Sequence, residues 1–128
     1  MKSLLIDVEN CEVKEVEISD FTDFYKYIGR SAFDVAGRYI GDENRWYDIF
    51  VDDIGMLKEN PIISAINVTE IMLVGNLVIT KTAENGEQLP LSDDDIKYLY
   101  KYIRTGYKRT EDGIYTYPVL VDVKYSKD

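Results

Sequence analysis

Histidine is absent from this chain of 128 residues, and cysteine occurs only once, at Cys11. Because histidine is the side chain whose pKa lies nearest to neutral pH, its absence removes the commonest general acid or base. Ser-His-Asp and Cys-His nucleophilic sites are therefore excluded within one chain. A single cysteine also excludes an intramolecular disulfide and a cysteine-rich zinc site, and it favours a reducing, cytoplasmic compartment.

Long apolar segments and glycine-rich loops are also missing. The first apolar run, Leu4 to Ile6, is interrupted at Asp7 and Glu9, and no run approaches the ~20 residues of a membrane-spanning helix. We therefore expect neither a leader nor a membrane span. The glycines are scattered singly, without the GxGxxG or GxxxxGK[ST] spacing of phosphate-binding loops, so a nucleotide enzyme is not expected.

Basic side chains are outnumbered, 15 against 24 acidic ones, which gives a net charge of −9. An acidic field repels phosphate backbones, so nucleic acid is not the expected partner. The charge favours solubility, although mimicry of nucleic acid is an alternative that the composition leaves open.

Paired carboxylates are the catalytic arrangement that remains. The candidates are Asp48, Asp52 and Asp53, of which the first two share one face of a predicted strand and the third points the other way. Alternation with Tyr47, Ile49 and Val51 predicts that Asp48 and Asp52 form the solvent face of a half-buried strand. We predict no metal site and no cofactor, because no EF-hand spacing is present.

Two segments have the hydrophobic spacing of amphipathic helices. The first begins at the N-cap Ser19-Asp20 and ends near Gly29, and the second begins at Ser92 and extends to Arg104. In each, apolar residues recur at i, i+3, i+4 and i+7 and therefore lie on one face. We expect the following core residues: Phe21, Phe24, Tyr25, Ile28, Ile96, Leu99, Tyr100 and Ile103.

The remaining segments favour strands. The predicted strands cover residues 2–9, 12–18, 35–40, 45–52, 71–80 and 114–125. Gly75 predicts a bulge or bend, Pro118 an edge strand or a strand in two pieces, and Asn60-Pro61 a short helix through Ile66. We expect a single α+β domain over residues 1–128: a mostly antiparallel sheet of five to seven strands with both helices on one face.

A faint internal repeat occurs at an offset of 75 residues. Glu9 to Glu12 resembles Glu84 to Glu87, and Tyr25 to Ile28 resembles Tyr100 to Ile103. The repeat predicts two related strand-turn-strand-helix halves, and chance similarity in a chain rich in Tyr and Lys is the alternative.

Several turn and cap residues accompany this order of elements. They are Tyr47, Val51 to Gly55, Asn60, Gly75, Gly86 and Leu91 to Asp93. Together with the order of elements, they resemble the family called domain of unknown function 3846, over about residues 2–104, with about 105–128 as a C-terminal extension. The resemblance implies a protein of phages, plasmids or integrated elements of gut bacteria, without an assigned activity.

Aromatic and basic side chains are the candidate binding residues. The segment between Ile96 and Thr110 contains cations and no acid, and helical spacing places Tyr98 and Lys101 away from the core stripe and Tyr102 at its edge. Such a face suits an acidic partner or single-stranded nucleic acid, or is simply a solvated helix end. Trp46 lies beside Arg45, and both residue types are common interface anchors. The predicted partner-binding residues are Trp46, Tyr98, Lys101 and Tyr102.

Three functions remain open. The first is a non-enzymatic binding protein of a mobile element that occupies a protein partner. The second is a dimeric module that senses a small ligand or nucleotide. The third is a hydrolase that uses carboxylates alone. A protein partner is expected, a homodimer is an open alternative, and neither nucleic acid nor membrane is expected as a partner.

Overall fold

The computed structural model describes residues 1–28, 33–52, 62–68 and 70–127, apart from the side chain of Phe21. Among these residues, the larger sheet contains seven strands in the order β11-β3-β4-β7-β1-β2, with β8 paired to β7. Its described pairings are antiparallel, as the sequence predicts. The strands are β1 (Lys2–Asp7), β2 (Glu12–Glu17), β3 (Phe33–Ile40), β4 (Arg45–Asp52), β7 (Leu77–Thr82), β8 (Gln88–Leu89) and β11 (Val123–Lys124).

Both faces of this sheet are apolar at its centre. Ile49, Ile79 and Leu4 lie side by side on one face, in the main core cluster. Phe50, Val78 and Leu5 form the neighbouring row, which belongs to a second cluster on the opposite face. Because the central strands carry apolar residues at consecutive positions, each face needs its own cover.

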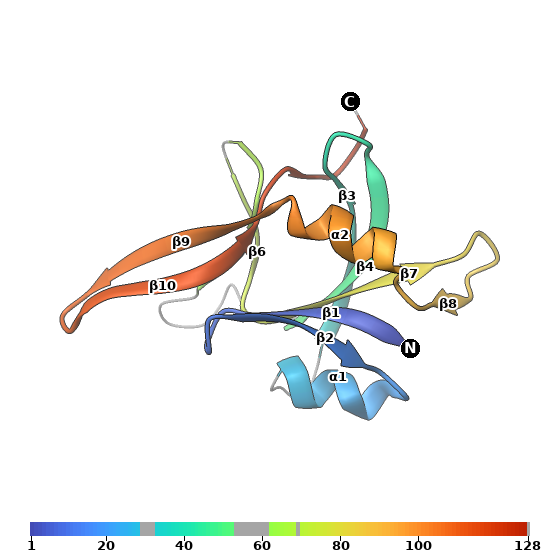
Figure 1. Ribbon diagram of the computed structural model, residues 1–128, viewed down its shortest axis with the longest axis horizontal. Coiled ribbons are helices and arrows are strands. Elements are labelled where there is room, and N and C mark those ends of the chain that lie inside the picture. Colours follow the sequence, from blue (N-terminus) through green and yellow to red (C-terminus); the bar gives the residue numbers. More distant parts are fainter. Residues whose placement is uncertain (29–32, 53–61, 69, 128) are drawn as a thin grey trace.

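The two helices provide this cover from opposite sides (Figure 1). α1 (Phe21–Ile28) packs through Phe24 and Ile28 against the face of Phe50, and α2 (Asp93–Tyr100) packs through Ile96 and Leu99 against the other. The prediction of an α+β fold with mostly antiparallel strands is confirmed. The prediction that both helices cover one face is wrong, because the central strands β4 and β7 carry apolar residues on both faces.

The smaller sheet is formed by β6 (Ile71–Val74), β5 (Ile63–Ile66), β10 (Gly113–Leu120) and β9 (Ile103–Thr110), in that order. Gly75 bends the chain between β6 and β7, so the predicted strand over 71–80 is shared by two sheets. The predicted short helix is wrong over residues 63–66, which pair with β6. Its proposed start at Asn60-Pro61 lies outside the described residues.

The C-terminal part also differs from the prediction. The second helix ends at Tyr100, because residues 103–110 pair with β10 along their entire length. The two strands form an arm that projects from the body (Figure 1). The predicted final strand is divided in two, but the division lies at Asp122, which has a φ of 57°, and not at Pro118.

The predicted core residues are partly confirmed. Phe24, Ile28, Ile96 and Leu99 are buried, whereas Ile103 is half-buried at the start of β9. Tyr25 and Tyr100 are 40% and 45% exposed, so their placement in the core is wrong. Tyrosine can lie at the margin of a core because its hydroxyl keeps a polar contact.

The internal repeat corresponds to a repeated order of elements, β1-turn-β2-α1 and β7-turn-β8-α2. Leu4 and Ile79, 75 residues apart, are direct partners on the same face of the sheet. A twofold rotation that exchanges β1 with β7 would therefore leave each face of the sheet on the same side. It would also place the two helices on one face, whereas α1 and α2 lie on opposite faces. No single rotation relates the two units in full.

Candidate functional site

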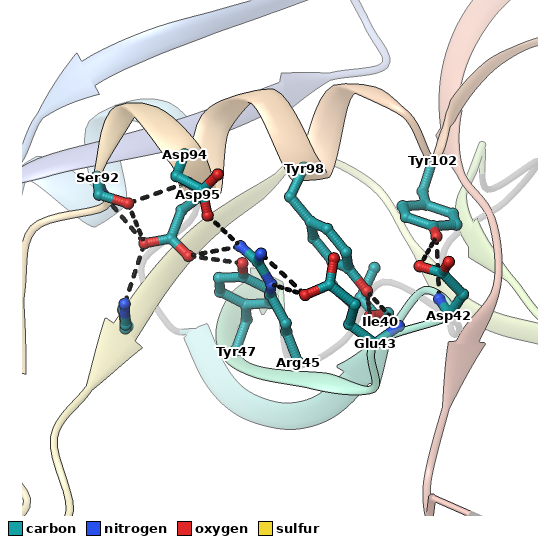
Figure 2. A network of polar contacts seen from close by, with 11 residues as sticks. Ile40, Asp42, Glu43, Arg45, Tyr47, Ser92, Asp94, Asp95, Tyr98 and Tyr102 are labelled. Carbon is teal, nitrogen blue, oxygen red and sulfur yellow. Dashed lines mark hydrogen bonds and ion pairs between the residues drawn. The ribbon is translucent and has the colours of Figure 1, made fainter.

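The most extensive described polar cluster lies between the start of α2 and strands β4 and β7, and Figure 2 shows it together with the turn that follows β3. At its centre is Asp95, which is 3% exposed. Ser92 is the N-cap of α2: its hydroxyl accepts a hydrogen bond from Asp95 N at 3.0 Å, and its own N donates to the Asp95 carboxylate at 3.0 Å. This reciprocal arrangement is a capping box, which satisfies two free N–H groups at the helix start.

Asp95 also receives donors from the sheet. Tyr47 of β4 donates its hydroxyl proton to Oδ1 at 2.8 Å, and Lys81 of β7 donates from Nζ to Oδ2 at 3.1 Å. Burial alone raises the pKa of Asp95, but the hydrogen bonds from Ser92, Tyr47 and Lys81 outweigh it and hold the pKa below its ordinary value. Burial and the bond to Asp95 raise the pKa of Tyr47, so its phenol stays protonated.

Arg45 completes what we call the Asp95 network (Arg45, Tyr47, Lys81, Ser92, Asp94 and Asp95). Its guanidinium lies 2.9 Å from Asp94, 3.0 Å from Glu43 and 3.6 Å from Asp95. It also lies 4.1 Å from the centre of the Tyr98 ring, a cation–π contact. The cations of the network therefore have carboxylate partners within the protein.

A pocket of about 390 Å³ opens beside this network, lined by Trp46 and the network residues. It has room for a small polar molecule. The charged groups that line the pocket, however, are already paired with one another, and the Tyr47 phenol is bound to the ionised Asp95 carboxylate. Such groups position a helix against a sheet and can orient a ligand by exchange of hydrogen bonds.

Tyr98 and Tyr102 hold the turn at residues 41–44 against α2, an arrangement that we call the hairpin clamp. The Tyr98 hydroxyl donates to Ile40 O at 2.5 Å and accepts from Glu43 N at 3.1 Å. The Tyr102 hydroxyl donates to Asp42 Oδ1 at 2.5 Å and accepts from Asp42 N at 2.9 Å (Figure 2). Burial raises the pKa of Tyr98 to about 12, and the bond from Tyr102 lowers the pKa of Asp42.

Two of the predicted partner-binding residues thus have structural contacts. Tyr98 is 2% exposed, so the prediction that it faces away from the core is wrong. Tyr98 lies beside the predicted stripe of Ile96, Leu99, Tyr100 and Ile103, and the turn after β3 covers this neighbouring side of the helix. Tyr102 is half-buried, and Lys101 is exposed with Nζ 5.9 Å from the centre of the Tyr98 ring.

Trp46, the fourth predicted residue, lies on the other face of β4 and is 46% exposed. Its ring meets Tyr39 edge-on at 4.9 Å between centroids and lies against Gly37 of β3. A Cβ at Gly37 would lie 2.0 Å from the indole, so the absence of a side chain at this position allows the close approach of the ring. With Val35, which is 48% exposed, these side chains form what we call the Trp46 surface (Val35, Tyr39 and Trp46).

The carboxylates that the sequence suggested do not form a solvent face. Asp52 is 5% exposed and Asp48 is half-buried, because Phe50 between them is covered by α1. Asp48 accepts a hydrogen bond from Thr82 Oγ1. Asp53 lies outside the described residues. In the described part of the chain, no three His, Cys, Asp or Glu side chains are grouped so as to hold a metal ion.

Sequence reasoning placed the start of the second helix at Ser92 but missed the roles of Tyr47 and Lys81. The cap is a local pattern, whereas the contacts of Asp95 with these two residues join positions 48 and 14 residues apart. Only the pairing of β4 with β7 brings the two donors together.

These observations define an α+β protein in which the described polar residues mainly join elements to one another. The family model described as Domain of unknown function (DUF3846) matches residues 1–104, and the chain belongs to this family. The resemblance found in the sequence is thereby confirmed. Comparison with curated proteins and with solved structures gave no match. None of the helices in the described segments is long and apolar enough to cross a bilayer.

Proposed function

We propose that the chain is a non-enzymatic binding protein of a mobile element, that it occupies a protein partner, and that the Trp46 surface makes the contact. The mobile-element context rests on the family resemblance alone. The half-exposed Trp46 is the observation that supports the proposed surface.

The geometry of Trp46 suits an interface anchor. Its ring is fixed between Gly37 and Tyr39 before any partner arrives, so binding immobilises few additional rotamers. Tryptophan is among the residues that contribute most binding free energy when they are placed at the centre of an interface. Lys127 Nζ lies 5.6 Å from the centre of the Tyr39 ring, which places a cation at the border of the surface.

The test compares Trp46→Ala with Ile71→Ala, a matched control because Ile71 is also apolar and is 48% exposed on the other sheet. We expect the wild type and Ile71→Ala to retain the same stoichiometric partner in a pull-down. Loss of an anchor costs about 2 kcal/mol or more, which corresponds to about 30-fold weaker binding for Trp46→Ala.

Because Trp46 is the only tryptophan, its fluorescence reports directly on the surface. Titration with the isolated partner should shift the emission to shorter wavelength and protect it from acrylamide. The assignment of this surface would be refuted if both variants bound the partner equally and if the partner left the Trp46 emission of the wild type unchanged. Circular dichroism establishes that each variant is folded.

The pocket beside the Asp95 network favours a second candidate, a module that senses a small ligand or nucleotide. A ligand present at about 100 times its Kd stabilises a protein by about 2.7 kcal/mol. A thermal-shift screen against nucleotides and small anions would detect such a gain. The same gain in Lys81→Ala would show that the ligand does not use this pocket.

A further inference from the structure

The outer edge of the arm is formed by β9, which pairs with β10 and with no other strand among the described residues. Val121 N donates to Tyr102 O at 2.7 Å, so residues 102 and 121 form a hydrogen-bonded pair of the antiparallel ladder. Such pairs alternate with pairs whose N–H and C=O groups point away from the partner strand. In β9 the outward groups therefore belong to Ile103, Thr105, Tyr107 and Arg109.

The position of Pro118 agrees with this alternation. Pro118 lies opposite Thr105, at a position where a strand residue directs its N–H away from β9. A proline there removes no hydrogen bond between the two strands. The outer edge of β9 is exposed at Thr105, Tyr107 and Arg109.

Charge distinguishes this edge from the rest of the protein. Residues 101–110 contain four cations and no acid, in a chain with a net charge of −9. The pleat places Arg104 and Lys108 on one face of β9 and Tyr107, which is 70% exposed, on the other. Ile114, 67% exposed, lies on the face of Tyr107, opposite Arg109.

We propose that β9 is a docking edge for an extended acidic segment of a partner protein, which adds to the small sheet as a further strand. Main-chain hydrogen bonds provide affinity in this mode of recognition, and alternate side chains provide specificity. The positive charge of β9 favours acidic side chains in the added strand, and the exposed Tyr107 favours an apolar side chain beside it. This surface is distinct from the Trp46 surface and does not depend on it.

Two other occupants fit less well. A second copy of this chain would oppose Arg104, Lys108 and Arg109 with the same three cations, and like charges across a strand pair are destabilising. A nucleic acid would meet Glu111 and Asp112, which are exposed at the tip of the arm between the two strands. If the arm entered a groove of a nucleic acid, its tip would enter first, and the two acidic side chains there would be repelled by the phosphates.

The experiment uses the full chain and three labelled peptides, EVEVEVE, EEEEVVV and KVKVKVK, followed by fluorescence anisotropy. We expect the alternating acidic peptide to bind at least tenfold more tightly than the other two. The second peptide tests the need for alternation, and the third tests the need for acidic charge. Equal affinity of EEEEVVV and EVEVEVE would reduce the interaction to simple charge attraction and would overturn the proposal.

Two variants test the main-chain contact. Thr105→Pro removes an outward N–H, and Thr105→Val keeps it with a side chain of similar shape. We expect Thr105→Pro to bind EVEVEVE at least tenfold more weakly than Thr105→Val, with both chains folded by circular dichroism. If the two variants bind alike, the edge is not used. Tighter binding of a thymidine oligonucleotide than of the peptide, or dimerisation abolished by Thr105→Pro, would assign β9 to the other occupants.

Discussion

Asp95 is the side chain on which three parts of the fold depend. It caps α2 through Ser92, binds the phenol of Tyr47 on β4 and forms an ion pair with Lys81 on β7. A buried carboxylate is favourable only when such donors replace the lost water. When the carboxylate is removed, these buried donors lose their acceptor and the folded state is destabilised.

We predict that Asp95→Asn lowers the free energy of unfolding by about 2–4 kcal/mol, since the amide keeps the shape but not the charge. Urea denaturation measures the effect. Asp94→Asn is the matched control: the Asp94 side chain is 75% exposed and forms an ion pair with Arg45. An exposed pair contributes less than about 1 kcal/mol, so the control should lose no more than that. Similar losses in both variants would contradict a central role for Asp95.

The same comparison has a defined dependence on pH. The pKa of Asp95 is lower in the folded protein than its ordinary value of 3.8, so its contribution to stability is complete above that value. The contribution is lost as the pH falls through 3.8 to the folded pKa. The difference in stability between wild type and Asp95→Asn should therefore be constant from pH 7 to about pH 5 and should shrink below about pH 4. A difference that grows in acid would contradict this sign.

Local patterns predicted many of the elements correctly, and pairing between distant segments explains the errors. The β3–β4 hairpin, both helix starts and the bend at Gly75 follow from caps, turns and hydrophobic spacing near each position. The stripe that ends at Ile103 is continuous in the sequence, but pairing with β10 takes that residue into a strand. The opposite placement of the helices likewise depends on which strands become central.

The candidate site was less predictable for the same reason. Trp46 was predicted from residue type, and its exposure follows from its place beyond the cover of α1. The burial of Tyr98 was not predicted, because the turn that covers it lies more than 50 residues earlier in the chain.

The junction between the β3–β4 hairpin and α2 can be tested at Gly41. Gly41 has a φ of 79°, and a Cβ there would lie 2.2 Å from the Tyr98 hydroxyl and 2.5 Å from the Tyr102 ring. Gly86, with a φ of 87°, is the matched control because a Cβ there would meet nothing within 4 Å. Both Gly→Ala variants should lose about 1–2 kcal/mol through the left-handed backbone.

Gly41→Ala should lose about 1–3 kcal/mol more, because Tyr98 and Tyr102 must move away from their hydrogen-bond partners. Thermal and urea denaturation of the two variants measure this difference. The difference should become smaller in the background of Tyr98→Phe and Tyr102→Phe, because the hydroxyl hydrogen bonds are then absent and only the contact with the Tyr102 ring remains. Equal destabilisation of Gly41→Ala and Gly86→Ala would show that the turn, and not its contact with α2, determines the cost.

The core of the protein extends beyond the family match. The match ends at residue 104, inside β9, whereas Val119, Leu120 and Val123 are 6%, 0% and 0% exposed and belong to the main core cluster. β11 also pairs with β3 at the edge of the larger sheet. The segment after residue 104 therefore contributes both to the arm and to the cover of the body.

We predict that a chain truncated after Arg104 does not fold. Each buried aliphatic side chain contributes about 1.5–3 kcal/mol, so the loss of Val119, Leu120 and Val123 removes about 5–9 kcal/mol, comparable with the entire stability of a domain. The control replaces residues 109–114, all exposed at the end of the arm, with an Asn-Gly turn that keeps the paired residues Lys108 and Tyr115. It should unfold cooperatively near the wild-type temperature, whereas the truncated chain should show no transition by circular dichroism or calorimetry. A cooperative transition in the truncated chain would mean that the matched segment folds alone, and the strands after it would then be an addition to a complete domain.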